Sequence, residues 1–337
     1  MEMPIMSEKR SQNARLVLLI HDMRLVLAIR RSSVTFLLVR WAVYARLRAM
    51  NQAIGIIGGS GLYSTDGITQ TEERVVDTPF GAPSDALIGG EIAGRQVWFL
   101  PRHGRGHRLL PHEINHRANF WALKSLGVRF VLCVAAVGSL KEEYAPRDIV
   151  LPDQYFDRTS RRDQHTFFGE GIAAHIGFSE PVSAGLREIL LESAQAEGAT
   201  VHNGGTYVNM DGPAFSTKAE SHANRQLGFD VIGMTNVAEA KLAREAEMAL
   251  ATLAMVTDYD CWHEEEEAVN VQTVIGHLTA NAELAQRVLK RAVSEIPLEA
   301  EWPEHIALDT AILTPMEYWP TETIKKLGPI IARFVPA

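Results

Sequence analysis

Two carboxylates beyond an apolar segment offer the most specific chemistry in this sequence. Residues 249–256 predict a buried strand, and Asp258 and Asp260 follow it two residues apart. If the strand continues, its alternation points both side chains to the same side. A carboxyl that faces a heterocyclic base can accept a hydrogen bond from an exocyclic amine and share a proton with a ring nitrogen. The alternative is that these acids cap a turn or a helix.

A glycine-rich turn follows another apolar segment. Residues 54–57 predict a buried strand, and Gly58-Gly59-Ser60-Gly61 come directly after it. Glycines let the backbone approach an anion closely, and exposed N–H groups with the Ser60 hydroxyl can bind phosphate oxygens. The turn is neither a Walker A motif nor a GxGxxG motif, and alone it is equally compatible with a tight structural turn.

A basic loop follows a third strand-like segment, residues 97–100. It begins with Arg102 and His103 and continues through Arg105 to His107. Arginine can bind phosphate with two parallel hydrogen bonds, whereas a solvated basic loop is the alternative. Ligands of open α/β sheets bind at the carboxyl ends of strands, so these three groups together indicate a site for a nucleoside and a phosphate.

Strand and helix patterns alternate along the chain from residue 51. Apolar strand-like runs lie at residues 54–57, 97–100, 130–137, 148–151, 206–210, 231–234 and 249–256. Helical periodicity lies at residues 113–126, 184–197, 218–227, 238–246, 269–296 and 320–327. This alternation predicts the α/β class, with a central mixed sheet flanked by helices. We expect a single domain over residues 51–300 and a C-terminal tail, residues 301–337, that packs on it.

Composition limits the remaining possibilities. The 337 residues carry a net charge of −8, which disfavours non-specific binding to nucleic acid. Cys133 and Cys261 both lie in apolar runs and predict buried thiols in a reducing compartment. No cluster of His and Cys predicts a metal site, and the four glutamates at 264–267 predict a solvated acidic turn.

The first 50 residues differ from the rest. They contain nine Lys and Arg against three Asp and Glu, a net charge of +6, so the remaining residues carry −14. Charges interrupt every apolar run, so none reaches the roughly 20 residues of a membrane span. Three interpretations stay open: a start codon placed upstream of Met50, an organellar targeting peptide, and a membrane-surface helix. We expect residues 1–50 to be a basic extension outside the fold.

The motifs are most specific when they are taken as a set. The set contains Gly58-Gly59-Ser60-Gly61-Leu62, Asp77-Thr78-Pro79-Phe80-Gly81, Arg102-His103-Gly104, Gly138-Ser139-Leu140, Gly212-Pro213, Phe215-Ser216, Met234-Thr235, Glu239 and Thr257-Asp258-Tyr259-Asp260-Cys261-Trp262. Over residues 53–296 it resembles the S-methyl-5′-thioadenosine phosphorylases of the trimeric purine nucleoside phosphorylase family. Residues 1–50 lie outside the resemblance.

The resemblance implies a fold, a reaction and an assembly. The fold is one α/β domain whose mixed sheet curls partly toward a barrel. The reaction is reversible phosphorolysis of methylthioadenosine to adenine and methylthioribose 1-phosphate, in methionine and purine salvage. Inorganic phosphate is the co-substrate, and no metal or organic cofactor is expected. The family further implies a cytoplasmic homotrimer that binds small molecules and neither nucleic acid nor membranes.

The resemblance also assigns roles to residues of this sequence. Phosphate would be held by Ser60, Arg102, His103, the backbone of Ala135 and Ala136, and Thr235. Substrate would be bound by Met234 at the ribose, Phe215 and Ser216 at the base, Val271 and Val274 at the methylthio group, and His175 from a neighbouring subunit. Asp258 would protonate purine N7, and Asp260 would assist at the amino group. General acid help of this kind is worth about 10²- to 10⁴-fold in rate.

Departures from the family pattern leave alternatives open. The chain has Ala135, Asp211, Ala214, Asn236 and Ala238 where Thr, Glu, Arg, Thr and Pro are usual. Relatives that act on 6-oxopurines have Asn in place of Asp258, because an amide can donate to a carbonyl whereas a carboxylate accepts from an amine. The alternatives are a 6-oxopurine nucleoside or methylthioinosine phosphorylase, and a non-catalytic nucleoside-binding protein.

Overall fold

Strand β5 (Val128–Ser139) lies at the centre of the fold in the computed structural model, which describes residues 52–58, 68–263 and 271–335. β5 pairs in parallel with β1 (Ala53–Gly58) and with β11 (Ala249–Asp258). Near its carboxyl end it also pairs antiparallel with β10 (Val231–Gly233). The three strands therefore meet along one element. The predictions for residues 1–50, Ser60 and the acidic run at 264–267 lie outside the described residues.

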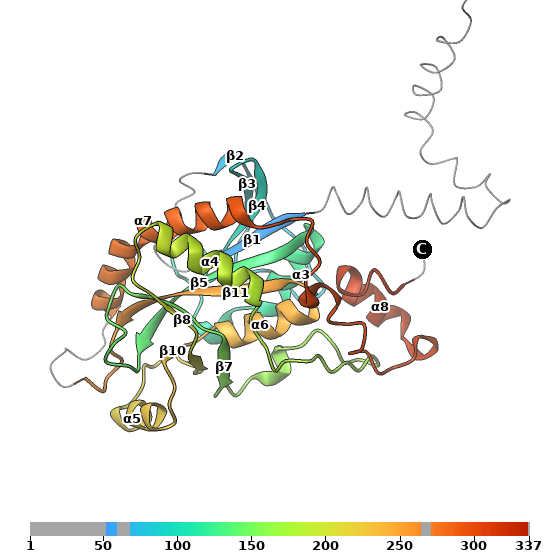
Figure 1. Cartoon of the computed structure of the whole chain (residues 1–337). Coiled ribbons are helices and arrows are strands. Elements are labelled where there is room, and N and C mark those ends of the chain that lie inside the picture. The colour runs from blue at the N-terminus through green and yellow to red at the C-terminus, as the bar shows by residue number, and fades with distance from the viewer. Residues whose placement is uncertain (1–51, 59–67, 264–270, 336–337) are drawn as a thin grey trace, which may run out of the picture. The chain divides into compact units, whose positions relative to one another are not determined.

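The other strands extend the sheet from these three neighbours (Figure 1). Beyond β1 lie β4 (Arg95–Pro101) in parallel register, then β3 (Leu87–Ile92) and β2 (Thr69–Arg74) antiparallel. Beyond β10 lie β9 (Thr206–Asn209) and β7 (Gln154–Asp157), and beyond β11 lie β6 (Ile149–Leu151) and β8 (Val201–Asn203). The described strands form one mixed, open sheet, which confirms the predicted class without closure into a barrel.

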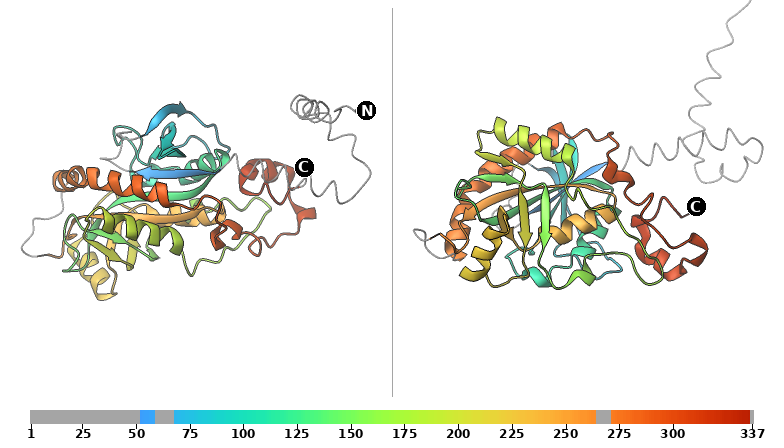
Figure 2. Two further views of the ribbon diagram at one scale, coloured as in Figure 1. Left: turned by 45° about the horizontal axis from the view of Figure 1, so that its top comes forward. Right: turned by 60° about the horizontal axis from the view of Figure 1, so that its bottom comes forward.

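Helices cover both faces of the sheet. Helices α4 (Ala184–Ala196) and α7 (Val271–Glu295) run side by side over one face, as Figure 2 shows, and pack on Phe130, Leu132 and Val134 of β5. The alternate β5 residues, Val131 and Cys133, face the second core. Helices α3 (His116–Ser125), α6 (Asn236–Glu245) and α8 (Thr321–Leu327) contribute to that core, and α5 (Lys218–Gln226) lies at the periphery. This alternation explains why the β5 sequence is continuously apolar.

Four of these strands do not show the patterns used for prediction. All six residues of β2 are exposed, so this strand has no apolar alternation to detect. β3 contains Gly89 and Gly90, which weaken any strand prediction. A Cβ atom at Gly89 would lie 2.5 Å from Cζ3 of Trp98, so glycine is needed there for close packing. The short strands β7 and β8 were not predicted either.

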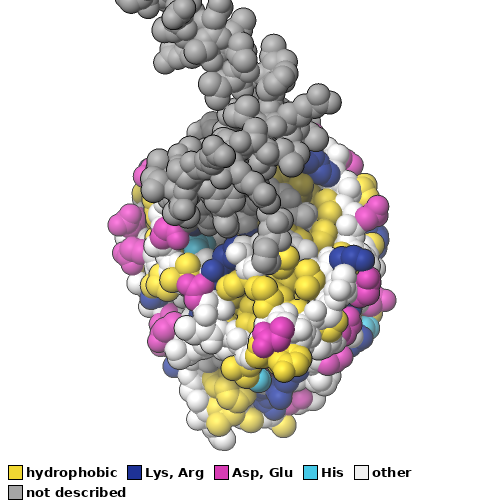
Figure 3. All heavy atoms as spheres, turned by 90° about the vertical axis from the view of Figure 1, so that its right-hand side faces the viewer, with side chains coloured by type: hydrophobic (Ala, Val, Ile, Leu, Met, Phe, Trp, Pro, Cys, Tyr) yellow, Lys and Arg dark blue, Asp and Glu magenta, His cyan; other side chains and the backbone are white. Residues whose placement is uncertain are grey.

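The C-terminal tail contributes to the second core. Leu308, Ala311, Leu327, Ile330 and Ile331 are buried with α3 and α6. The predicted helix at 320–327 is observed as α8. Figure 3 views the side of the molecule on which this tail lies, where apolar side chains gather between charged ones. Across the described residues, every helix is too short or too polar to cross a membrane.

Candidate active site

Parallel strands β1, β4, β5 and β11 end at one edge of the sheet, and several of the predicted site residues lie near it. Gly58 at the end of β1 is paired with Pro101 at the end of β4. The next residue, Arg102, donates its N–H to the Gly58 carbonyl at 2.8 Å. The glycine-rich turn and the basic loop therefore start side by side.

Arg102 is a buried side chain paired with an acid. It is only 2% exposed, so a solvated basic loop does not describe it. Its Nε and Nη2 donate to Oε1 and Oε2 of Glu239 at 2.5 and 2.9 Å, and Nη1 donates to the Val134 carbonyl at 2.7 Å. These bonds use three of the five N–H groups of the guanidinium. Burial lowers the pKa of Arg102, but the Glu239 carboxylate outweighs burial and raises it.

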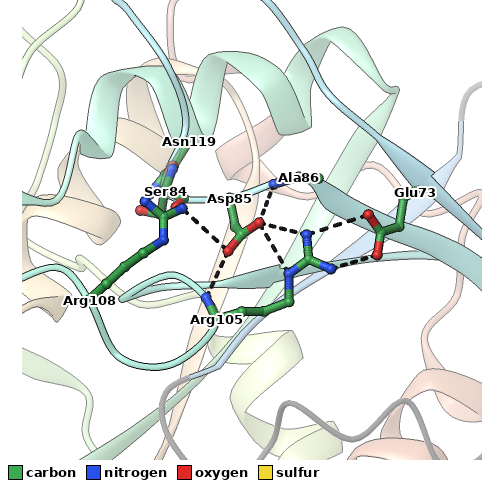
Figure 4. A network of polar contacts seen from close by, with 7 residues as sticks. All are labelled: Glu73, Ser84, Asp85, Ala86, Arg105, Arg108 and Asn119. Atoms are coloured by element: carbon green, nitrogen blue, oxygen red, sulfur yellow. Dashed lines mark hydrogen bonds and ion pairs between the residues drawn. The ribbon is translucent and has the colours of Figure 1, made fainter.

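The other arginines of this loop have structural partners. Arg105 forms ion pairs with Asp85 at 2.9 Å and with Glu73 at 2.6 Å, and Arg108 donates to the Ser84 carbonyl (Figure 4). Burial raises the pKa of Asp85, but its hydrogen bonds with Arg105 prevail and lower it to about 2. The ion pairs of Arg105 with Asp85 and Glu73 therefore explain its presence in this loop without a role in binding an anion.

His103 is a neutral imidazole at physiological pH. Burial, aided by the charge of Arg102, lowers its pKa to about 4. Its Nδ1 lies 2.9 Å from the Leu109 carbonyl, and its ring stacks on His107 with centroids 4.3 Å apart. A carbonyl only accepts, so Nδ1 carries the proton and Nε2 is an acceptor. His103 can therefore receive a hydrogen bond from a hydroxyl, such as a protonated phosphate oxygen.

The backbone at Ala135 and Ala136 is flanked by β11, and β10 pairs with β5 just beyond it, at Gly138 and Ser139. β11 places Ala254 and Met255 opposite these residues. β10 runs antiparallel to β5 from Val231, opposite Ser139, so its continuation past Gly233 heads toward Ala136.

That continuation leads to Thr235, which is 6% exposed and is the N-cap of helix α6. Helix N-termini present free N–H groups and a positive dipole end to anions. Arg102 reaches the same place, because its partner Glu239 lies in the first turn of α6. An anion could be bound here.

Asp258 and Asp260 are brought together by a turn that follows β11. Strand alternation, the basis of the prediction from the sequence, does not bring them together. β11 ends at Asp258 after a β-bulge, and Asp260 lies in a turn with φ of 52°, so the expectation of two strand side chains on one side is wrong for Asp260. The Asp260 N–H donates to Asp258 Oδ1 at 2.8 Å, and the Thr257 hydroxyl donates to Oδ2 at 2.7 Å. Gly138 of β5 lies against the pair, since a Cβ atom there would be 2.9 Å from Asp258 Oδ1.

Both acids have raised pKa values. Burial raises the pKa of Asp258 to about 6, against the opposing hydrogen bonds from Thr257 and Asp260. Burial also raises the pKa of Asp260, and the nearby Ser221 and Ser216 hydroxyls oppose it in part. Oδ2 of Asp260 is nevertheless buried without a hydrogen bond of normal geometry from the described residues. A carboxyl with a pKa of about 6 can donate a proton near neutral pH.

The predicted base-binding loop lies between Met234 and this acidic pair. At one end, a Cβ atom at Gly212 would lie 2.5 Å from the Met234 sulfur, so the two residues are in close contact. At the other end, the Ser216 carbonyl accepts a hydrogen bond from the Cys261 thiol at 3.2 Å. Phe215 is 43% exposed. The loop thus brings the predicted ribose and base residues next to each other.

Three predicted residues are not joined to this cluster by the described contacts. His175 is exposed, and its backbone N–H donates to Ala311 of the tail. Its predicted role belongs to a neighbouring subunit. Val271 and Val274 lie at the start of α7, and their side chains lie outside the described residues.

A cavity of about 40 Å³ adjoins the cluster. Among the described residues that line it, Met234 is the only predicted site residue. Its wall includes His116 and His165, which were not predicted, and burial lowers the pKa of His116 to about 4.

Two contributions to the cluster were missed by sequence reasoning. Glu239 was noticed only as part of a motif, although an acid on an Ala- and Leu-rich helix face is a signal of a buried ion pair. Gly138 was noticed without a role in the site, as part of the Gly138-Ser139-Leu140 motif, although a glycine at a strand end can mark a close approach to another group. Among the described residues, no group of three His, Cys, Asp or Glu side chains could hold a metal ion.

Comparison with known proteins identifies the family. Residues 53–294 match the family described as the phosphorylase superfamily. The S-methyl-5′-thioadenosine phosphorylase of Geobacter sulfurreducens is 51% identical over 286 residues, which cover 85% of this chain and 100% of that protein. This chain belongs to the S-methyl-5′-thioadenosine phosphorylase family. It is accordingly an enzyme of the purine nucleoside phosphorylase type, a pentosyltransferase.

Further members of the family agree. The S-methyl-5′-thioadenosine phosphorylase of Chloroflexus aurantiacus is 54% identical over 281 residues, covering 83% of this chain and 98% of that protein. The crystal structure of a methylthioadenosine phosphorylase from an antarctic soil metagenomic library has a TM-score of 0.79 and 47% identity. The match covers 84% of this chain and 98% of that structure. The nucleoside phosphorylase fold is therefore shared.

Proposed function

We propose that this protein catalyses the reversible phosphorolysis of S-methyl-5′-thioadenosine to adenine and 5-methylthioribose 1-phosphate. The observation that carries the proposal is that anion-binding groups and an acidic pair lie at two different points along β5. Arg102 donates to the carbonyl of Val134, the residue before Ala135, and Gly138 lies against Asp258. Gly138 is three positions along the strand from Ala135, roughly 10 Å at 3.3 Å per residue. A sugar fits between an anion and a base at that separation.

The anion end would hold inorganic phosphate. The positive end of α6, the Thr235 hydroxyl and the free N–H groups of Arg102 can each donate to phosphate oxygens. The neutral His103 can accept from a protonated phosphate oxygen. Phosphate held there attacks the anomeric carbon as the glycosidic bond breaks, through a transition state of oxocarbenium character.

The acidic end would activate the leaving base. Protonated Asp258 donates to purine N7 as the bond to the sugar breaks, so adenine leaves as a neutral molecule. Its pKa of about 6 keeps a useful fraction protonated near neutral pH. The unpartnered Oδ2 of Asp260 can accept from the amino group of adenine, which a 6-oxopurine lacks. No resident cofactor or metal enters this scheme.

The acidic pair favours an aminopurine substrate over a 6-oxopurine, and the buried Arg102 favours a phosphorylase over a non-catalytic nucleoside-binding protein. A 6-oxopurine would place a carbonyl against a carboxylate oxygen, and a nucleoside-binding protein would have no need of a buried Arg102. We therefore compare kcat/KM for methylthioadenosine and methylthioinosine at saturating phosphate. A preference of at least tenfold for methylthioadenosine supports the proposal. Equal use of the two, or a preference for methylthioinosine, contradicts the role given to Asp260.

The assembly and location form the remainder of the proposal. We infer a homotrimer, in which His175 closes the methylthio pocket that Val271 and Val274 line in a neighbouring subunit. Exposed apolar side chains of the tail, such as Leu313 and Tyr318, support a subunit interface. We also infer a cytoplasmic location, which agrees with free thiols, and a role in methionine and purine salvage. Light scattering of the purified protein tests the trimer.

A further inference from the structure

Arg102 and Glu239 form an ion pair that is removed from water on all sides. The two side chains are 2% and 1% exposed, and both guanidinium-to-carboxylate bonds are made at the same time. Such a two-pronged pair fixes the plane of the guanidinium as well as its position. The third bond, to the Val134 carbonyl, ties that plane to β5 one residue before Ala135.

Asn236 holds the acid of this pair in turn. It is fully buried in the first turn of α6, and its Nδ2 donates to Oε2 of Glu239 at 2.8 Å. The amide cannot be turned around without placing its oxygen against the carboxylate, so this orientation is determined by the contact. A threonine hydroxyl at this position could donate the same hydrogen bond to Glu239.

We propose that Glu239 is a positioning residue for the phosphate site and that Asn236 positions Glu239. The inference rests on the proposed function, because it names what orients Arg102 toward phosphate. Glu239 occupies two N–H groups of Arg102 and the Val134 carbonyl a third, which leaves two donors of the guanidinium for a ligand. It also neutralises Arg102 before phosphate arrives, so the guanidinium stays buried and in place while the site is empty. Glu239 itself does not touch the reacting atoms.

The first test replaces Glu239 by glutamine, which keeps the size of the side chain and removes its charge. We expect KM for phosphate to rise about 10- to 100-fold, since hydrogen bonds to charged groups are among the stronger ones. Binding of methylthioadenosine, measured by calorimetry, should change less than twofold. Glu245→Gln is the matched control, because Glu245 is a buried acid of the same helix that bonds to Thr166 and Phe167 instead.

The second test changes Asn236 and leaves the ion pair intact, so it remains informative where Glu239→Gln does not fold. Asn236→Ala removes one hydrogen bond to Glu239, and we expect phosphate binding to weaken roughly 3- to 10-fold. Asn236→Thr restores a hydroxyl donor and should return phosphate binding to within twofold of wild type. Phosphate binding by calorimetry reports on both variants without catalysis.

The outcomes are distinguishable. If wild type shows phosphate-dependent turnover but Glu239→Gln and Asn236→Ala leave phosphate KM within twofold, the positioning role is overturned. The same holds if phosphate and nucleoside binding weaken equally, because that is the signature of a structural role. If wild type neither binds phosphate nor needs it for turnover, the proposed function fails, and this inference fails with it.

Discussion

Replacing Asp258 by asparagine is expected to stabilise the protein at neutral pH while it removes most of the activity. Asparagine has the same shape, and its Oδ1 can still accept from the Asp260 N–H. The Thr257 hydroxyl, which now donates to Oδ2, can turn to accept from the new amide. The substitution therefore removes a charge and an acid but leaves the local hydrogen bonds.

The expected gain in the free energy of unfolding of the variant equals the free energy that wild type loses by burying this carboxylate. Burial raises the pKa of Asp258 from 3.8 to about 6, a change of about two units. At 1.36 kcal/mol per unit this is about 3 kcal/mol. Because the folded-state pKa is the higher one, the stability linked to the proton is fully present below pH 3.8 and is lost as pH rises through 6. The advantage of the variant should therefore grow between pH 4 and 6 and be constant above about pH 7.

Urea denaturation at pH 5, 6, 7 and 8 measures this advantage directly. Asp163→Asn, at an exposed aspartate outside the cluster, is the matched control and should show no such trend. In the same samples kcat/KM for methylthioadenosine should fall by about 10²- to 10⁴-fold, as is usual when a general acid is lost. An Asp258→Asn protein that is less stable than wild type at pH 8, or an advantage independent of pH, would refute the reasoning.

Three further perturbations test other parts of the site and fold. Gly138→Ala places a Cβ atom 2.9 Å from Asp258 Oδ1 and should lower kcat/KM roughly 10- to 100-fold by displacing the acid; unchanged kinetics would contradict this packing. Because the pKa of His103 is lowered to about 4, the ring is neutral above pH 5, so the ratio of phosphate KM between His103→Gln and wild type should be constant from pH 5.5 to 8. Arg333→Ala leaves the buried Glu247 without its 2.7 Å partner and should lower the free energy of unfolding by about 1–3 kcal/mol, measured by urea titration; no change would mean that the tail contact is dispensable.

The parts of the fold that the sequence predicted are those with a strong apolar pattern. The strand predicted at 130–137 is observed within β5, and the helix predicted at 184–197 is observed as α4. β5 is buried on both faces, which leaves a continuous apolar run, whereas α4 buries one face, which leaves a helical periodicity. β2 could not be predicted in this way, because its six residues are all exposed and carry no apolar pattern.

The site was predicted in its residue types and strand ends but not in its contacts. Arg102 could be noticed as a strand-end arginine, but its partner Glu239 lies 137 residues away, and no local pattern reports such a pair. The two aspartates were expected to meet through strand alternation. In the structure a turn with positive φ at Asp260 brings them together, and aspartate gives only a weak local signal for that conformation.

One site of this protein is proposed to hold phosphate beside a nucleoside and to join the phosphate to the sugar. The most direct measurement follows adenine released from methylthioadenosine by the full-length protein, with phosphate added and with phosphate removed. We expect adenine release to require phosphate and to yield methylthioribose 1-phosphate in equal amount. Release at the same rate without phosphate, with free methylthioribose as the product, would contradict it.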